Sequence, residues 1–254
     1  MASVTRLCHR LKKEVENMTE KTIGILGGMG PEATLDLFGK IIASTPAATD
    51  QEHLRVVIDS NPKVPDRTAA ILRGGESPVP AMRAGIAALK RAGADFVVIP
   101  CVSAHVFLDE LQREADLPIL SMFDVTAEHI RRHPAHIRNV GLLATTGTLQ
   151  GGRFRERLQQ SGIESITPVG PDQERVMAAI YEIKGAPGGR DRAAIGAEVR
   201  DIAGRLIERG AQGIVAGCTE IPLVVRPGDL EVPVFDTLLL LARAAITAAG
   251  QSPV

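Results

Sequence analysis

The sequence predicts an α/β protein with two pseudo-symmetric Rossmann-like lobes, each a parallel sheet flanked by helices, and an active site in the cleft between them. Short apolar runs typical of buried strands alternate with longer segments typical of helices. An internal repeat with one fixed spacing is the second observation. Length is the third, because 254 residues with 44% hydrophobic residues exceed one average domain and can bury a sizeable core.

The first half of the chain alternates predicted strands and helices around a glycine-rich turn. Pro31 suits the first position of a helix and Glu32 its first turn, so a helix should follow that turn. In order, we predict the strand 22–26, the helix 31–44, the strand 55–59, the loop-rich stretch 60–80, a helix ending at Arg91, the strand 96–99 and a helix after Ser103.

The second half continues the alternation. We predict strands over 140–144, 163–167 and 213–216, and helices over about 172–184, 191–209 and 237–249. We assign 21–120 together with 235–254 to the first lobe and 121–234 to the second. Residues 1–20 have basic side chains but no continuous apolar core of a secretory signal, so we expect a mobile N-terminal extension.

Two separate parts of the chain repeat at the same spacing. The run from Gly24 resembles the run from Gly141, and the run ending at Cys101 resembles the run ending at Cys218, both 117 residues apart. Leu117-Pro118-Ile119 is answered by Val232-Pro233-Val234 at nearly the same distance. Independent segments that share one offset indicate two homologous lobes, each with a turn after its first strand and a cysteine after a later one.

Composition excludes several classes of function. Twenty-nine basic residues against 30 acidic ones give a net charge of −1, and with one Tyr, six Phe and no Trp the chain lacks a basic stripe and stacking platforms for nucleic acid. No run of about 18 apolar residues predicts a membrane span. Three cysteines, Cys8, Cys101 and Cys218, form an odd, sparse set that favours reduced thiols in the cytoplasm.

Cys101 and Cys218 are the strongest candidates for chemistry. Each follows a predicted parallel strand and precedes a predicted helix, and ligands of open parallel sheets bind beyond such strand ends. A helix N-terminus favours a thiolate. Two facing lobes therefore place the sulfurs on opposite sides of one cleft, as a two-base proton transfer at a stereocentre requires.

Other interpretations of these cysteines remain. Cys101 and His105 are four residues apart and Cys218 could add a third zinc ligand, but the tight ligand pairs of closed zinc sites are missing and we predict no metal. A Cys/His hydrolase leaves Cys218 unexplained. We expect His105 to lie on a helix face near the site, with a role in polarising Cys101 as a further hypothesis.

The turn Gly27-Gly28-Met29-Gly30 lacks the patterns of nucleotide-binding loops. Its backbone N–H groups, at a helix N-terminus, can instead hold a carboxylate. The repeat places Thr145-Thr146-Gly147 opposite for the same kind of task.

Four ordered motifs together resemble the aspartate/glutamate racemase superfamily, and its aspartate racemase branch in particular. They are Gly27 to Thr34, Ser60-Asn61-Pro62 with Pro65-Asp66-Arg67, Ile99 to His105, and Gly217 to Glu220. The resemblance spans about residues 21 to 249. It implies an amino-acid racemase without a cofactor that interconverts L- and D-aspartate, or glutamate, two Rossmann-like lobes, a homodimer, and Cys101 and Cys218 as the catalytic pair. The expected partner is a small-molecule amino acid or dicarboxylate.

The resemblance also assigns binding residues. Arg67 matches an arginine that binds the side-chain carboxylate of the substrate, and Lys184 matches a lysine with the same task. Glu220 stands where some relatives carry His and is predicted to contact the amino group or assist the thiol. The predicted donors to the carboxylate and amino groups of the substrate are Gly28, Met29, Gly30, Asn61, Ser103, Thr145, Thr146, Gly147 and Thr219.

One position departs from the family pattern. Val102 and Ser103 follow Cys101 where the family usually has Asn and Thr. Ser keeps a hydroxyl, whereas Val cannot hydrogen-bond a substrate, and one lost bond to a charged group removes about 1.5–3 kcal/mol. Affinity is then reduced, or Asn61 compensates, or the substrate differs from aspartate. A related isomerase or decarboxylase of a dicarboxylate, and a non-catalytic carboxylic-acid-binding protein, therefore remain alternatives.

Overall fold

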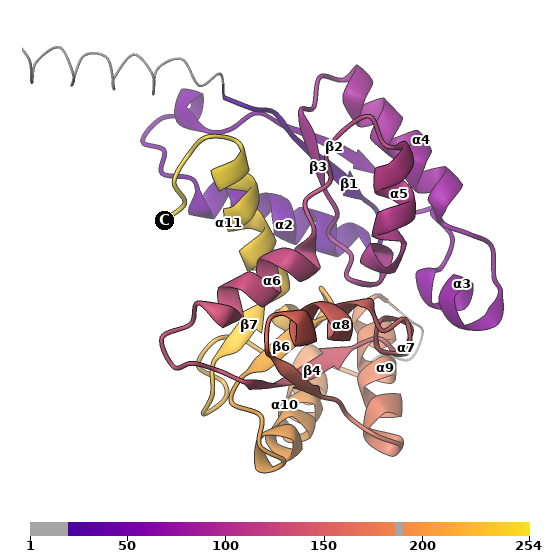
Figure 1. Cartoon of the computed structure of the whole chain (residues 1–254), viewed down its shortest axis with the longest axis vertical. Coiled ribbons are helices and arrows are strands. Elements are labelled where there is room, and N and C mark those ends of the chain that lie inside the picture. Colours follow the sequence, from indigo (N-terminus) through magenta and orange to yellow (C-terminus); the bar gives the residue numbers. More distant parts are fainter. Residues whose placement is uncertain (1–19, 186–189) are drawn as a thin grey trace, which may run out of the picture.

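A computed structural model describes residues 20–185 and 190–254, and it confirms the predicted fold class (Figure 1). Two separate parallel sheets, each flanked by helices, form two lobes. Cys8 and residues 1–19 of the predicted extension lie outside the described residues. No helix among the described residues is both long enough and apolar enough to cross a membrane.

The first sheet has the strand order β2-β1-β3 and is entirely parallel. Its strands are β1 (Ile23–Gly27), β2 (Val56–Ser60) and β3 (Phe96–Val98). The helices of this part of the chain are α2 (Pro31–Ser44), η1 (Asp50–Glu52), α3 (Arg67–Arg73), α4 (Val79–Arg91), η2 (Ser103–Phe107) and α5 (Leu108–Glu114).

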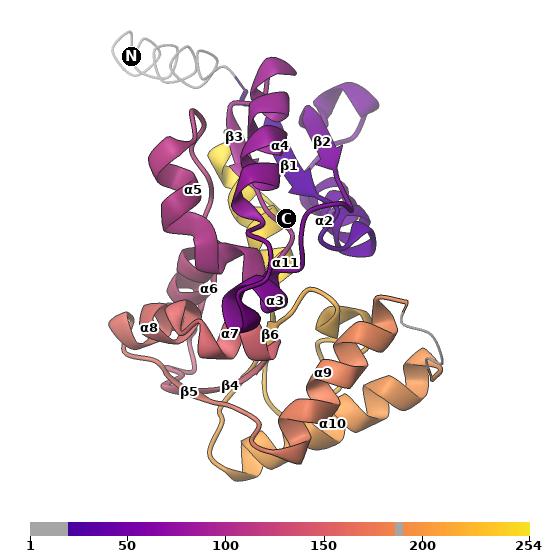
Figure 2. The same ribbon diagram turned by 90° about the vertical axis from the view of Figure 1, so that its right-hand side faces the viewer.

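The second sheet has the order β5-β4-β6-β7 and is also parallel. Its strands are β4 (Asn139–Ala144), β5 (Glu164–Ile166), β6 (Ile214–Gly217) and β7 (Val234–Asp236). The remaining helices are α6 (Met122–Arg131), α7 (Thr146–Gln150), α8 (Arg153–Gln160), α9 (Pro171–Ile183), α10 (Arg192–Glu208), η3 (Ile221–Leu223) and α11 (Thr237–Ala248). Helices α9 and α10 pack side by side (Figure 2).

The repeat in the sequence corresponds to a repeat in the sheets. Strand β1 lies between β2 and β3, and β4 lies between β5 and β6. Val97 of β3 forms a parallel bridge with Ile119, just as Ile214 of β6 pairs with Val234 of β7. Cys101 follows the carboxyl end of β3, and Cys218 follows the carboxyl end of β6, 117 residues later. Equivalent edges of the two sheets therefore carry the two thiols.

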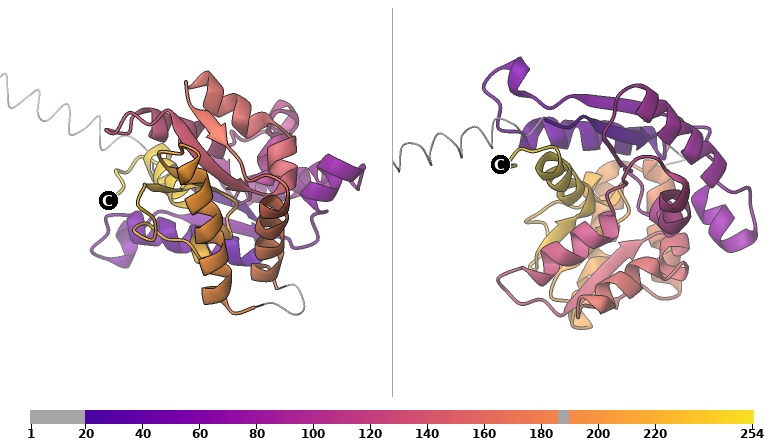
Figure 3. Two further views of the ribbon diagram at one scale, coloured as in Figure 1. Left: turned by 90° about the horizontal axis from the view of Figure 1, so that it is seen from below. Right: turned by 45° about the horizontal axis from the view of Figure 1, so that its top comes forward.

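One apolar cluster is shared by the two lobes. It includes Ile25 of β1, Leu37 of α2, Leu142 of β4 and Leu241 of α11, all almost completely buried. Helix α11 packs on both α2, which follows the first strand of the first sheet, and α6, which precedes the second sheet (Figure 3). It therefore links the two lobes. Burying one such side chain stabilises the fold by about 1.5–3 kcal/mol. Two further clusters cover the remaining faces of the sheets.

Several elements differ from the prediction. The stretch 60–80 was expected to be loop, but α3 forms inside it because Asp66 accepts a hydrogen bond from Ala69 N and Gly74 ends the helix with a left-handed φ of 60°. The expected helix after Ser103 begins as the 3-10 helix η2 before α5. The short strand β7 and helices α6, α7 and α8 were not predicted.

Candidate active site

Cys101 follows β3 in a tight loop. Its side chain is buried, and its Sγ lies 3.5 Å from Ser103 Oγ. Nδ1 of His105 lies 2.9 Å from the Cys101 carbonyl oxygen. Since a carbonyl can only accept, the ring donates this bond and holds the backbone of the loop.

Cys218 follows β6 and is equally buried. Its Sγ donates to Glu220 Oε2 at 2.9 Å, and Thr219 Oγ1 donates to the same oxygen at 3.3 Å. Burial, and then the negative charge of Glu220, raise the pKa of the Cys218 thiol well above its ordinary value. Cys218 therefore rests as a thiol beside a carboxylate.

Lys184, at the C-terminal end of α9, connects several of the predicted site residues. Its Nζ lies 3.6 Å from Glu220 Oε1. Burial opposes its charge, but the charges of Cys218, Glu220 and Cys101 outweigh that effect and raise the pKa of Lys184 to about 12. The ammonium group is thus within electrostatic reach of both thiols.

Arg67 begins α3 and is buried, with 9% of its surface exposed. Its Nη1 donates to the carbonyls of Val64 and Pro65 at 3.2 and 3.0 Å, and its Nη2 donates to that of Met29 at 3.4 Å. Nε has no hydrogen-bond partner among the described residues. Backbone carbonyls hold the guanidinium in place without neutralising its charge, which suits recognition of an anion.

The glycine turn approaches both Asn61 and Glu220. Gly28 has a φ of 90°, and a Cβ there would lie 2.3 Å from the Asn61 carbonyl carbon, so only glycine fits. The N–H of Gly28 donates to Thr34 Oγ1 at 2.9 Å, and it is therefore occupied. A Cβ on Gly30 would lie 3.9 Å from Glu220 Oε1, which brings the turn of the first lobe to a carboxylate of the second.

The predicted Thr145-Thr146-Gly147 segment opens α7. Thr145 Oγ1 caps the helix by accepting from Thr148 N at 3.1 Å, and Thr146 Oγ1 accepts from Gln173 Nε2 at 3.2 Å. A Cβ on Gly147 would lie 3.0 Å from Thr68 Cα, so α7 packs closely against α3.

Asn61 and Val102, which the sequence singled out, both make contacts within the protein itself. Asn61 Oδ1 accepts from Lys63 N at 2.9 Å, and the side chain is half-buried. Val102 is 2% exposed and belongs to the apolar cluster shared by the lobes. The apolar residue that departs from the family pattern therefore contributes to the core.

A cavity of about 420 Å³ lies between the lobes at this point. Arg67, Lys184 and Glu220 share its lining with Gly28 and Gly30. Neither cysteine is part of the lining, but Glu220, which is, contacts Cys218 directly. The remaining lining residues are Pro31, Glu32, Pro62, Asp66, Tyr181 and Ile183.

An ion pair that the sequence did not predict involves Glu32, a residue of the cavity lining. Nη2 of Arg192 lies 2.6 and 2.8 Å from the two carboxylate oxygens of Glu32. Glu32 belongs to α2 and Arg192 begins α10, so the pair joins the two lobes. The two residues are 160 positions apart in the chain, so no local pattern indicates this contact.

No three His, Cys, Asp or Glu side chains within residues 20–185 and 190–254 gather as a potential metal site. His105, which was considered as a zinc ligand with Cys101, directs its Nδ1 to the backbone carbonyl of that residue.

Comparison with known proteins identifies relatives of this architecture. Residues 26–245 match the family described as Asp/Glu/Hydantoin racemase. The chain is 26% identical over 231 residues to the broad specificity amino-acid racemase RacX of Bacillus subtilis (strain 168), covering 89% of this chain and 96% of that protein.

Two solved structures share the fold. Picrophilus torridus aspartate racemase superposes with a TM-score of 0.82 at 31% identity, covering 92% of this chain and 96% of the other. An aspartate racemase homologue from Pyrococcus horikoshii OT3 gives a TM-score of 0.72 at 28% identity, covering 91% of this chain and all (100%) of the other. The resemblance noted in the sequence is confirmed at the level of the family.

Proposed function

Because the chain belongs to the Asp/Glu/hydantoin racemase family and is an amino-acid racemase, we propose that it interconverts L- and D-aspartate, or glutamate, by proton transfer between Cys101 and Cys218. The observation that carries this proposal is geometric: Glu220 lines the cavity between the lobes, accepts from Cys218 Sγ at 2.9 Å and lies 3.6 Å from Lys184 Nζ. A buried thiol whose pKa is raised beside such a charged pair is typical of a reaction centre.

The raised pKa of Cys218 sets the roles of the two cysteines in one half-reaction. Cys218 starts as the thiol and is the proton donor, so we propose that Cys101 is the base. Cys101 removes the α-proton from one face, and Cys218 delivers its own proton to the opposite face. The product leaves Cys101 as a thiol and Cys218 as a thiolate, which is the form that accepts the other enantiomer.

Lys184 and Glu220 adjust the energy of that exchange. Once Cys218 has lost its proton, a thiolate lies beside the Glu220 carboxylate, and repulsion makes this form costly. Lys184, which lies 3.6 Å from Glu220, offsets part of the added negative charge. We propose that Glu220 and Lys184 together keep the two protonation states close enough in energy for turnover.

Recognition of the acidic side chain falls to Arg67 and Lys184. The Arg67 guanidinium is held by backbone carbonyls and its Nε is unpaired among the described residues, which leaves capacity for a carboxylate. We retain as proposed contacts to the rest of the substrate Gly28, Met29, Gly30, Asn61, Ser103, Thr145, Thr146, Gly147, Thr219 and Glu220. Those whose donors are already used in this structure, such as Gly28, must exchange a partner to contribute.

A broad-specificity amino-acid racemase is the second candidate. The burial of Val102 in the apolar cluster favours it, because a polar substrate contact usual in the family is then missing. The relative from Bacillus subtilis carries that description. A homodimer and a cytoplasmic location are further expectations that accompany the proposal.

Racemisation can be tested by polarimetry on each enantiomer of aspartate, glutamate and several neutral amino acids. We expect activity on aspartate or glutamate in the wild type, its loss in Cys101→Ser and in Cys218→Ser, and wild-type rates in Cys8→Ser. Comparable rates on neutral amino acids support the second candidate. Full activity in either of the first two variants contradicts the two-cysteine proposal.

A further inference from the structure

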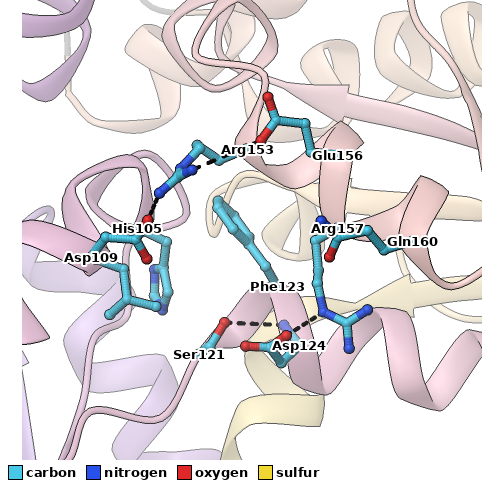
Figure 4. A pocket seen from close by; sticks show the side chains of 10 residues that line it. His105, Asp109, Ser121, Phe123, Asp124, Arg153, Glu156, Arg157 and Gln160 are labelled. Carbon is cyan, nitrogen blue, oxygen red and sulfur yellow. Dashed lines mark hydrogen bonds and ion pairs between the residues drawn. The ribbon is translucent and has the colours of Figure 1, made fainter.

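A second cavity, of about 230 Å³, surrounds His105 and shares no lining residue with the cavity between the lobes (Figure 4). Three elements form it. His105 and Asp109 come from η2 and α5, Phe123 and Asp124 from the start of α6, and the remaining charged groups from α8. The mechanism proposed above uses none of these side chains.

A buried histidine whose Nε2 has no hydrogen-bond partner among the described residues lines this cavity. His105 is 2% exposed and its ring centroid lies 5.4 Å from that of Phe123. Nδ1 donates to the Cys101 carbonyl, whereas Nε2 has no hydrogen-bond partner among the described residues. A buried polar atom without a hydrogen-bond partner costs free energy, so a ligand that hydrogen-bonds Nε2 would gain stability from that contact.

The free nitrogen requires a donor. Burial lowers the pKa of His105, although the carbonyls of Cys101 and Leu120 favour its charged form. A neutral ring that donates through Nδ1 presents a lone pair at Nε2. Backbone carbonyls cannot supply a hydrogen to it, so the partner must carry an N–H or O–H group.

The rim of the cavity presents charges of both signs. Arg153 and Arg157 lie one turn apart on α8 and form ion pairs with Asp109 and Asp124. Glu156 projects from the same helix and is 59% exposed. Exposed ion pairs such as these contribute little on their own, so an incoming ligand can replace them at low cost.

We propose that this cavity is a second binding site, for a small zwitterion of the free amino-acid class. The ammonium group of the ligand hydrogen-bonds His105 Nε2 and faces the carboxylates of the rim. Its carboxylate binds a guanidinium of Arg153 or Arg157, for which bidentate geometry is favoured. Because His105 also holds the Cys101 carbonyl, the site is one hydrogen bond away from the proposed catalytic loop.

Glycine is a suitable probe, because it is the smallest such zwitterion and lacks the side-chain carboxylate that Arg67 and Lys184 would select. The full-length protein is titrated with glycine while the ring resonances of its histidines are followed by NMR, with His105 assigned by its loss in His105→Asn. We expect a saturable change at Nε2 of His105.

Two variants locate the binding. Arg157→Gln should weaken glycine binding roughly tenfold or more, the effect of losing one charge-assisted contact. Arg131→Gln, which removes an exposed arginine paired with Glu128 on α6, is the control and should bind as the wild type does. The idea is wrong if the His105 signal does not move, or if it moves equally in Arg157→Gln.

A third variant separates this site from the reaction centre. If glycine acted only through the cavity between the lobes, Arg67→Gln would weaken the titration and Arg157→Gln would not, and that result overturns the proposal. Racemisation is measured independently of the titration. Failure of the second site therefore leaves the proposed function untouched, and the reverse also holds.

Discussion

Replacing Glu220 by Gln tests the electrostatic coupling at Cys218. The carboxylate raises the pKa of the thiol through its charge and through a hydrogen bond, with Sγ and Oε2 separated by 2.9 Å. Two unit charges 2.9 Å apart interact with about 6 kcal/mol at an effective dielectric constant of about 20, and one pKa unit corresponds to about 1.4 kcal/mol. The charge of Glu220 can therefore account for at most about four units of pKa.

The expected fall is smaller than this limit. Burial, the largest cause of the raised pKa, persists in Glu220→Gln, and Lys184 already offsets part of the carboxylate charge. We expect the pKa of Cys218 to fall by about one to two units. The thiolate fraction at a pH below both values then rises roughly tenfold to a hundredfold.

Alkylation by iodoacetamide measures this change, because the thiolate is the reacting form. The rate at Cys218 is followed by mass spectrometry of its peptide as a function of pH, and burial affects the absolute rate more than the midpoint. The midpoint should move to lower pH in Glu220→Gln and stay unchanged in Glu182→Gln, which removes a half-buried carboxylate that pairs with Arg190 instead. An unchanged or higher midpoint in Glu220→Gln refutes the coupling.

Four further changes test other parts of the structure. Arg67→Lys should raise KM for aspartate by roughly tenfold with a smaller effect on kcat, because a point charge replaces a planar fork; equal values for both enzymes contradict its role. Removing the ion pair between the lobes with Glu32→Gln or Arg192→Gln should change kcat/KM by less than about fivefold, and kcat/KM of the variant should depend less on ionic strength than that of the wild type. Leu241→Ala should lower the free energy of unfolding in urea by about 2–5 kcal/mol, and a loss below about 1 kcal/mol denies it a core position. Gly28→Ala should destabilise the fold and reduce activity, since its Cβ would meet the backbone of Asn61 at 2.3 Å; a stable, active variant means that the turn adapts.

The fold was largely predictable because strand-forming runs and the repeat gave independent signals. Parallel strands buried on both faces are nearly continuous apolar runs, and the offset between Cys101 and Cys218 matches the equivalent places of β3 and β6. Helix α3 was missed because the density of Pro and Gly dominated the prediction. Its boundaries depend on Asp66 and Gly74, whose local hydrogen bonds and dihedral angles a composition count does not contain.

The candidate site could be predicted in its residue types but not in its contacts. The sequence indicated Arg67, Lys184 and Glu220, and the structure brings all three to the lining of one cavity. The sequence did not indicate that Thr34 occupies the N–H of Gly28, and it left open whether Glu220 assists the Cys218 thiol or contacts the amino group of the substrate. Such bonds depend on side-chain positions set by tertiary packing, which no local pattern encodes.

The central claim is that two thiols act on opposite faces of the substrate. Racemisation of L-aspartate in heavy water tests it most directly, with the isotope content of both enantiomers measured by mass spectrometry before equilibrium is reached. We predict that the D-aspartate formed carries deuterium at the α-carbon while the remaining L-aspartate keeps protium, because one thiol delivers a solvent-exchanged proton and the opposing thiol retains the one it removed. D-aspartate that retains the protium of its substrate, as transfer by a single base would give, contradicts the account.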